Sequence, residues 1–232
     1  MARTSKFLIL LVPVLGLCAP SEQMIFDVAH DFSPAKNPQG VWQYGYSQTN
    51  SLAPDQFRLD TYAEKTGMIG FWHPLANDKP GPGYYPYVGY NTTAESQFGS
   101  QHGWAVRADQ IAMEASNTGQ YSLVRFIAPK SGVYQITARF EGVHFGLSTT
   151  DVHVLHNAEP LFDAYIEGYG GDPSFHKIEG AQPTASFDKS IRLMSNDIVT
   201  FAVGYGRNKT HFGDTTGLSA KITLVSASRV KS

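Results

Sequence analysis

Alternating apolar and polar positions dominate the second half of this chain. Apolar residues occupy every second position in two stretches, namely Tyr134, Ile136, Ala138 and Phe140, and then Leu218, Ala220, Ile222 and Leu224. A period of two is the signature of a strand with one buried face. Further strands are predicted at 150–157 and 160–169, and 190–206 is predicted to hold two strands around a turn at Ser195, Asn196 and Asp197.

Turn signals recur about every ten residues, which is typical of a sandwich or barrel. A Pro-Lys-Ser-Gly turn at 129–132 separates two predicted strands. The best helical candidate, 107–116, is more consistent with a strand in this setting. We therefore expect an all-β fold, an antiparallel β-sandwich of jelly-roll type, formed by one domain over residues 20–232 with long aromatic loops. A separate N-terminal domain is the alternative.

The first nineteen residues have the pattern of a secretory signal peptide. Arg3 and Lys6 precede an apolar run from Phe7 to Leu17, and small residues follow. That run of about eleven residues is too short to span a bilayer as a helix. The pattern predicts a signal peptide at 1–19 and a secreted, periplasmic or cell-surface protein.

Charge and cysteine content narrow the function classes. Without residues 1–19, 16 basic and 20 acidic residues remain, so the net charge is −4. Such a mild acidic balance predicts no nucleic-acid partner. The sequence shows no second apolar segment long enough to span a membrane, so a membrane anchor is not predicted. The single cysteine, Cys18, lies in the predicted signal peptide. A chain of this length without disulfides can still bury a sufficient core.

Several segments resemble known protein groups. The motif FIAPKSGVYQITARFEG, followed by RLMSNDIVTFAVGYG, is similar to the strand-turn sequence of jelly rolls, including carbohydrate-binding modules and tumour-necrosis-factor-like domains. The segments 26–48, 119–136, 148–162 and 201–222 resemble uncharacterised exported bacterial proteins related to PEP-CTERM-type surface proteins. The resemblance implies export and a β-sandwich, and it brings no catalytic residues. Sugar binding is an expectation from the fold analogy.

Four tyrosines are concentrated in GPGYYPYVGYNTT, residues 81–93. Proline and glycine predict an irregular loop there, and an exposed tyrosine offers an apolar ring with a polar edge. Pyranose rings stack on such surfaces through their C–H face, while their hydroxyls bond to nearby polar groups. The predicted ligand-binding residues are Trp72, Tyr84, Tyr85, Tyr87, Tyr90 and Asn91. Packing of these rings onto the sheet is the competing interpretation.

Signals for catalysis and metal binding are weaker. The usual nucleophile, zinc-protease and phosphate-loop motifs are missing. Asp151, Asp163 and Glu167 are the available acids for a hydrolase, although exposed acids are the simpler interpretation. His153 and His156 have odd spacing and should point to opposite faces of a strand. A structural calcium would need Asp27 and Asp214 to meet through pairing of the first and last strands.

The residues therefore favour an exported, non-catalytic protein that binds carbohydrate through an aromatic platform. An adhesive surface protein that binds other protein chains, as an oligomer or otherwise, is the first alternative. A polysaccharide hydrolase is the second. No cofactor is expected apart from the calcium just considered.

Overall fold

A computed structural model describes residues 23–74, 84–99 and 103–227. The predicted signal peptide lies outside the described residues. Within the described part of the chain, no helix is long and apolar enough to cross a membrane. The fold is an all-β sandwich with antiparallel sheets, as the alternating pattern predicted.

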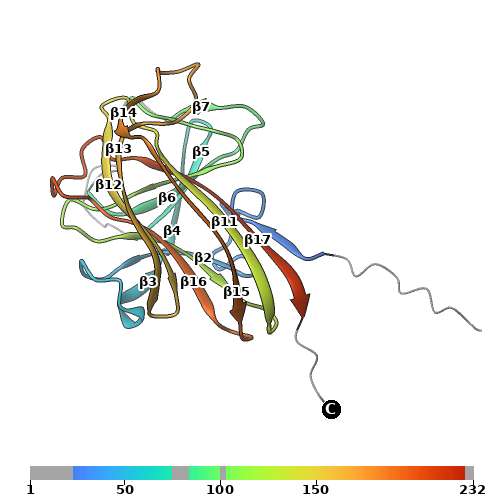
Figure 1. Ribbon diagram of the computed structural model, residues 1–232. Helices are drawn as coiled ribbons and strands as arrows, with labels where there is room; N and C mark the ends of the chain where they lie inside the picture. The colour runs from blue at the N-terminus through green and yellow to red at the C-terminus, as the bar shows by residue number, and fades with distance from the viewer. Residues whose placement is uncertain (1–22, 75–83, 100–102, 228–232) are drawn as a thin grey trace, which may run out of the picture.

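Two large sheets form the two layers (Figure 1). The eight-stranded sheet runs in the order β15-β11-β17-β9-β6-β5-β4, with β1 paired to β17. Its strands are β1 (Ile25–Asp27), β4 (Tyr62–Thr66), β5 (Ile69–His73), β6 (Tyr87–Asn91), β9 (Ile111–Glu114), β11 (Gly132–Gly142), β15 (Thr184–Leu193) and β17 (Thr216–Ala227).

The seven-stranded sheet runs in the order β14-β13-β12-β16-β10-β2-β3. Its strands are β2 (Trp42–Ser47), β3 (Phe57–Leu59), β10 (Ser122–Ile127), β12 (Ser148–His156), β13 (Glu159–Tyr169), β14 (Glu179–Gln182) and β16 (Ile198–Val203). A small third sheet pairs β7 (Gln97–Phe98) with β8 (Ala105–Val106), and a 3-10 turn, η1, covers Pro54–Gln56.

The alternating residues of both sheets build the core between the layers. On β11, Tyr134, Ile136 and Phe140 are fully buried, while Thr137 and Arg139 face outward. Facing strands of the other sheet contribute a second set of buried side chains, Val124, Phe126, Val152, Val154, Val199, Phe201 and Val203. Each large apolar side chain buried in this way contributes roughly 1.5–3 kcal/mol to folding.

The strand predictions hold in detail. The turn at 129–132 joins β10 to β11, and the turn around Asn196, whose φ is 73°, joins β15 to β16. The ambiguous segment 107–116 contains strand β9 and no helix. The first and last strands do pair, with Asp27 opposite Lys221.

One connection positions the site described below. Strand β16 belongs to the seven-stranded sheet and β17 to the eight-stranded sheet. The loop between them, residues 204–215, therefore crosses from one layer to the other at the end of the sandwich (orange-red, at the left of Figure 1).

Candidate functional site: the 204–215 loop

The predicted tyrosine platform is mostly not on the surface. Of its residues only Tyr84 is exposed, at 45 %. The segment that follows Pro86 is strand β6, which is paired on both sides with β5 and β9, and not an irregular loop. The expectation of an exposed platform is therefore wrong for Trp72, Tyr85, Tyr87, Tyr90 and Asn91, since the sheet buries four of them and half-buries Tyr90.

Two of these buried polar rings, Trp72 and Tyr87, have the hydrogen-bond partners that burial demands. The Trp72 indole N–H donates to the Ser33 carbonyl at 2.6 Å. The Tyr87 hydroxyl donates to Glu114 Oε2 at 3.1 Å and lies 3.2 Å from Thr215 Oγ1. These contacts are structural, because they hold the rings inside the sandwich.

The remaining predicted residues pack locally. Tyr85 stacks on His73, with ring centres 4.4 Å apart, and Tyr90 stacks on Phe32 at 5.1 Å. The Asn91 side-chain amide donates to a carbonyl oxygen of Val106 at 3.3 Å and closes the turn that follows β6.

Exposed rings gather instead around the 204–215 loop. Phe212 on this loop is 76 % exposed, and its ring centre lies 4.3 Å from that of His211. His211 in turn lies 6.3 Å from the ring of Tyr84, the one predicted platform residue that reaches the surface. His211 is itself buried, so Tyr84 and Phe212 supply the exposed rings, and we refer to Tyr84, His211 and Phe212 together as the aromatic ledge.

A small pocket lies against the same loop, at Arg207 and Asn208. It has a volume of about 170 Å³ and is lined by Thr149, Tyr165, Ile166, Glu167, Arg207 and Asn208. Tyr165 is 37 % exposed, and the Arg207 guanidinium lies 3.8 Å from the centre of its ring. The residues around the pocket therefore carry one aromatic ring, a hydroxyl, a carboxylate, a carboxamide and a guanidinium, while the lining surface itself is mostly apolar.

Asp151 fixes the first half of the loop. Its Oδ1 accepts a hydrogen bond from the Gly206 N–H at 2.7 Å, and its backbone carbonyl accepts one from Gly204 at 2.8 Å. Its Oδ2 lies 2.7 Å from His153 Nε2. Burial tends to raise the pKa of Asp151, but the hydrogen bonds from His153 and Gly206 outweigh it and lower the pKa.

His153 bridges two of the acids that the sequence suggested for hydrolysis. Its Nδ1 lies 2.5 Å from Asp163 Oδ1, on the side of the ring opposite to Asp151. Burial tends to lower the pKa of His153, but the two carboxylates outweigh this and raise it. A general acid needs a raised carboxyl pKa, and Asp151 has the opposite shift. The geometry is that of a charged anchor for the loop.

Asp214 joins the second half of the loop to Thr149 on strand β12. Its Oδ1 accepts hydrogen bonds from the Thr149 N–H at 2.7 Å and from Thr149 Oγ1 at 3.0 Å. Its Oδ2 is buried and has no hydrogen-bond partner among the described residues. Burial raises the pKa of Asp214 to about 7, and burial likewise raises the pKa of nearby Glu114 to about 7. Two buried carboxyl groups, those of Asp214 and Glu114, therefore lie close to the second half of the loop.

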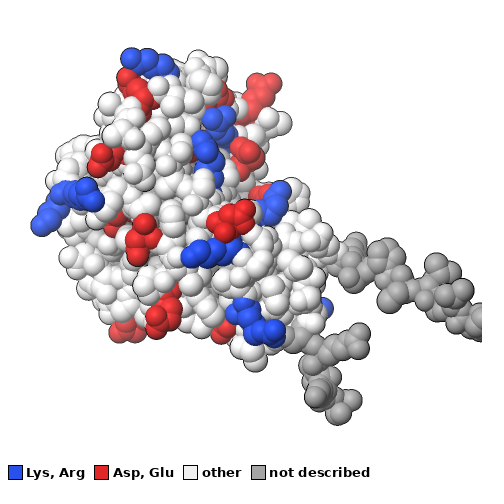
Figure 2. Space-filling view, viewed as in Figure 1, with Lys and Arg blue, Asp and Glu red and all other residues white. Residues whose placement is uncertain are grey.

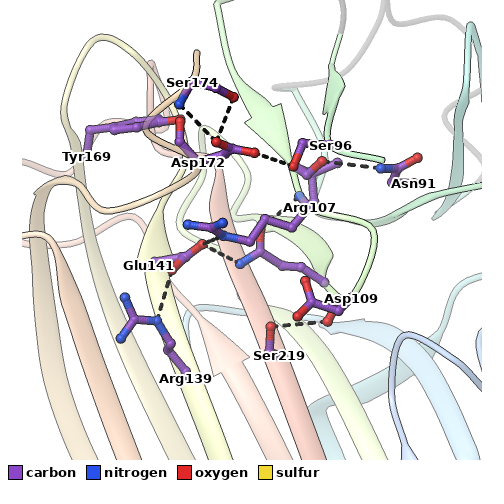
Figure 3. Close-up of polar contacts among 12 residues, drawn as sticks. Asn91, Ser96, Arg107, Asp109, Arg139, Glu141, Tyr169, Asp172, Ser174 and Ser219 are labelled. Carbon is purple, nitrogen blue, oxygen red and sulfur yellow. Dashed lines mark hydrogen bonds and ion pairs between the residues drawn. The ribbon is translucent and has the colours of Figure 1, made fainter. Parts of the chain in front are cut away.

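A second polar cluster lies at one end of the outer face of β11 (Figure 3). The buried Glu141 carboxylate accepts from Arg107 Nε at 2.9 Å, Gln110 Nε2 at 2.8 Å and Arg139 Nε at 3.0 Å. Nearby, hydrogen bonds from Ser96 and Ser174 lower the pKa of Asp172 to about 2. These contacts tie neighbouring segments together and leave Glu141 fully paired.

A shallow groove of about 410 Å³ continues from this cluster across β15, β11 and β17. Its outward-facing lining is made of hydroxyl and charged side chains, including Thr137, Ser219 and Asp188. No exposed large aromatic ring is among its lining residues. Figure 2 shows acidic and basic side chains interspersed over this face. The groove therefore lacks the exposed aromatic rings that surround the 204–215 loop.

The expected calcium ligands do not meet. Asp27 forms an ion pair with Lys221 at 3.3 Å. Asp214 precedes β17, and five strand positions separate Lys221 from Thr216, or about 17 Å of extended chain. Among the described residues, no group of three or more His, Cys, Asp and Glu side chains has a geometry that could hold a metal ion. His156 also binds away from His153, with Nε2 2.9 Å from Asp197 Oδ2.

Of the loop residues, only Asp214 was considered from the sequence, as a possible calcium ligand. The surrounding residues Tyr84, Asp151, Asp163 and Glu167 were also considered. The segment GYGRNKTHFGD, residues 204–214, has Tyr205 and Phe212 with Arg207 and Lys209 in a glycine-rich run, and this composition was the available signal.

Comparisons with known proteins give structural similarity only. No family model matches the sequence, and no curated protein matches it. A family 35 carbohydrate-binding module from Clostridium thermocellum is 12% identical, with 59% of this chain and 90% of that chain covered and a TM-score of 0.33. A family 51 module from a Clostridium perfringens protein, in complex with methyl-galactose, is 13% identical, with coverages of 56% and 81% and a TM-score of 0.34. Rabbit GITRL is 12% identical, with coverages of 47% and 76% and a TM-score of 0.28.

Proposed function

We propose that this protein is an exported, non-catalytic binding protein that recognises carbohydrate through the 204–215 loop. The observation that carries the proposal is the exposure of Phe212, Tyr84 and Tyr165 around one loop, beside a pocket with four kinds of polar group. Exposed rings with polar neighbours match a ligand that has an apolar face and a fringe of hydroxyls.

The support of the loop suits recognition, because a binding surface gains affinity when it is ordered before the ligand arrives. Asp151 and Asp214 hold the two halves of the loop by hydrogen bonds to Gly206 and to Thr149. The rings are therefore displayed on a fixed segment. The pocket has room for a single small ring, and the ledge of Tyr84, His211 and Phe212 offers a further contact surface.

Two features argue against hydrolysis at this site. Asp151 and Asp163 share His153, and the pKa of Asp151 is lowered, so Asp151 is not prepared to donate a proton. The acids near this loop that have a raised pKa, Glu114 and Asp214, are both buried, at 8 % and 1 % exposure. Glu114 Oε2 also accepts hydrogen bonds from two hydroxyl groups. A glycosidase needs both carboxyl groups at the scissile bond.

The test is a glycan array followed by calorimetry on the glycans retained. Phe212→Ala and Tyr165→Ala are each expected to weaken binding at least tenfold, about 1.4 kcal/mol. Tyr62→Ala is the matched control, because Tyr62 is 43 % exposed on the edge strand β4. Retention of no glycan, or equal losses in all three variants, would reject the proposal. Self-association in light scattering without glycan binding would instead favour the adhesive alternative.

A further inference from the structure

Arg207 is a cation without a carboxylate partner. Among the described residues it makes no hydrogen bond or ion pair, and its contact is with the ring of Tyr165. Arg107 and Arg139 differ, since both donate to Glu141. The donors of the Arg207 guanidinium therefore remain available at the mouth of the pocket.

The position of Arg207 is nevertheless well defined. The preceding residue, Gly206, donates to Asp151, and the side chain of the following residue, Asn208, donates to Thr149 Oγ1. The guanidinium carbon then lies 3.8 Å from the centre of the Tyr165 ring, a contact that stabilises a cation against an aromatic ring. A guanidinium held in this way loses little freedom when it binds a ligand.

A second basic side chain lies two residues further along the loop. Lys209 is exposed, and it has no hydrogen bond or ion pair within the part of the chain that the structure describes. Basic side chains protrude in Figure 2 at the edge where Figure 1 draws this loop. The loop thus carries two unpaired positive charges beside its exposed rings.

One unpaired acid opposes them. Glu167 is exposed, lines the same pocket and lies opposite Thr149 in the β12–β13 register. The other nearby acids, Asp151 and Asp163, are both bound to His153. The rim formed by Arg207, Lys209 and Glu167 therefore has a net charge of about +1, although the whole chain has −2.

We propose that the glycan recognised by this loop is anionic, and that Arg207, assisted by Lys209, binds its carboxylate or sulfate groups. This inference rests on the proposed function and names the class of its ligand. A planar guanidinium matches two oxygens of either anion with two parallel hydrogen bonds. The exposed rings of Tyr165 and Phe212 would contact the sugar rings that carry the charge.

Three polysaccharides separate the possible anions: polygalacturonate, which carries carboxylates, dextran sulfate, which carries sulfates, and uncharged dextran. Affinity electrophoresis of the full chain is expected to show retardation by one or both charged polymers and little by dextran. Retardation should fall as salt rises from 50 to 300 mM, because salt screens the attraction between exposed charges. The Debye length is about 8–10 Å near physiological salt.

Charge variants then test the assignment to residues. Arg207→Gln is expected to weaken binding of the charged polymer at least tenfold and Lys209→Gln about threefold. Glu167→Gln should strengthen it several-fold, a gain that a neutral ligand would not show. Lys130→Gln is the control, because Lys130 is an exposed cation in the β10–β11 turn, at the other end of β17 from the loop. It should change binding less than twofold.

The outcomes distinguish the two proposals. Binding of neutral glycans that depends on Phe212 but not on Arg207 would overturn the anionic assignment and leave the proposed function intact. Equal effects of Arg207→Gln and Lys130→Gln on a charged polymer would also overturn it, because they indicate non-specific attraction. Absence of binding to any glycan would reject both.

Discussion

The backbone N–H of Gly206 donates to Asp151 Oδ1 at 2.7 Å, and this is one of several hydrogen bonds that join the 204–215 loop to strand β12. Gly206 has a φ of 68°, and a Cβ added there would lie 2.0 Å from the Thr149 carbonyl oxygen. Gly206→Ala is therefore expected to displace the loop and to lower the free energy of unfolding by more than about 2 kcal/mol.

Gly40→Ala is the matched control for this variant. Gly40 has a similar φ of 56°, but a Cβ added there meets nothing within 4 Å. It should cost only the conformational term, about 1–2 kcal/mol. Urea unfolding of both variants measures the difference, and equal losses would show that the close approach to Thr149 does not matter.

The ion pair between His153 and its two acids predicts a pH-dependent effect of substitution. The folded pKa of His153 is raised, so its contribution is complete below pH 6.5 and is lost as pH rises through the folded pKa. The pKa of Asp151 is lowered, so its contribution is lost as pH falls below 3.8. His153→Gln should therefore cost most near pH 5, about 2 kcal/mol, and less at pH 9. A loss that does not vary between these pH values would contradict the assigned charges.

The buried carboxyl groups predict a fall in stability toward alkaline pH. Burial raises the pKa of Glu114 from 4.5 to about 7 and that of Asp214 from 3.8 to about 7, and it raises the pKa of Asp60 well above its usual value. A raised carboxyl pKa means that the folded state holds protons that the unfolded state has released. The free energy of unfolding should decrease between pH 4 and pH 8, by about 1–3 kcal/mol for each group.

Chemical denaturation across that pH range provides the measurement. Asp214→Asn should flatten the dependence, because the amide does not titrate and keeps an oxygen for the Thr149 donors. Asp55→Asn is a suitable control, since Asp55 is exposed in the 3-10 turn η1. An equally steep profile in Asp214→Asn and in the unmodified chain would contradict the prediction for Asp214.

The buried platform predicts stability effects in place of binding effects. Tyr87→Phe removes the hydroxyl that lies beside Glu114 and Thr215, and should lower the free energy of unfolding by about 1–2 kcal/mol. Glycan affinity should stay within twofold of the unmodified chain. A tenfold loss of affinity in a variant of unchanged thermal midpoint would restore Tyr87 to the binding surface.

Much of the fold could be predicted because strand periodicity is a local property. The alternation at Tyr134, Ile136 and Phe140 needs only neighbouring residues to be recognised, and β11 has the buried pattern that it predicted. The Asn196 turn and the β1–β17 pairing follow from similarly short signals. Proline and glycine misled at Tyr87 and Tyr90, because strand β6 begins directly after Pro86 and is covered on both sides by other strands.

The candidate site could be predicted only in part, because it depends on contacts between distant segments. Tyr84 was selected from its local composition, whereas its neighbour His211 lies on the β16–β17 connection. Arg207 over Tyr165 likewise joins that connection to β13. A loop has no periodicity, so nothing in the sequence indicated which rings it brings together.

The 204–215 loop passes from β16 in one sheet to β17 in the other. A molecule bound across it would touch residues attached to both layers, for example Tyr165 on β13 and Phe212 just before β17. A bound ligand would therefore link the two sheets at this end of the sandwich. Hydrogen exchange should then become slower in both sheets, well beyond the atoms that the ligand touches.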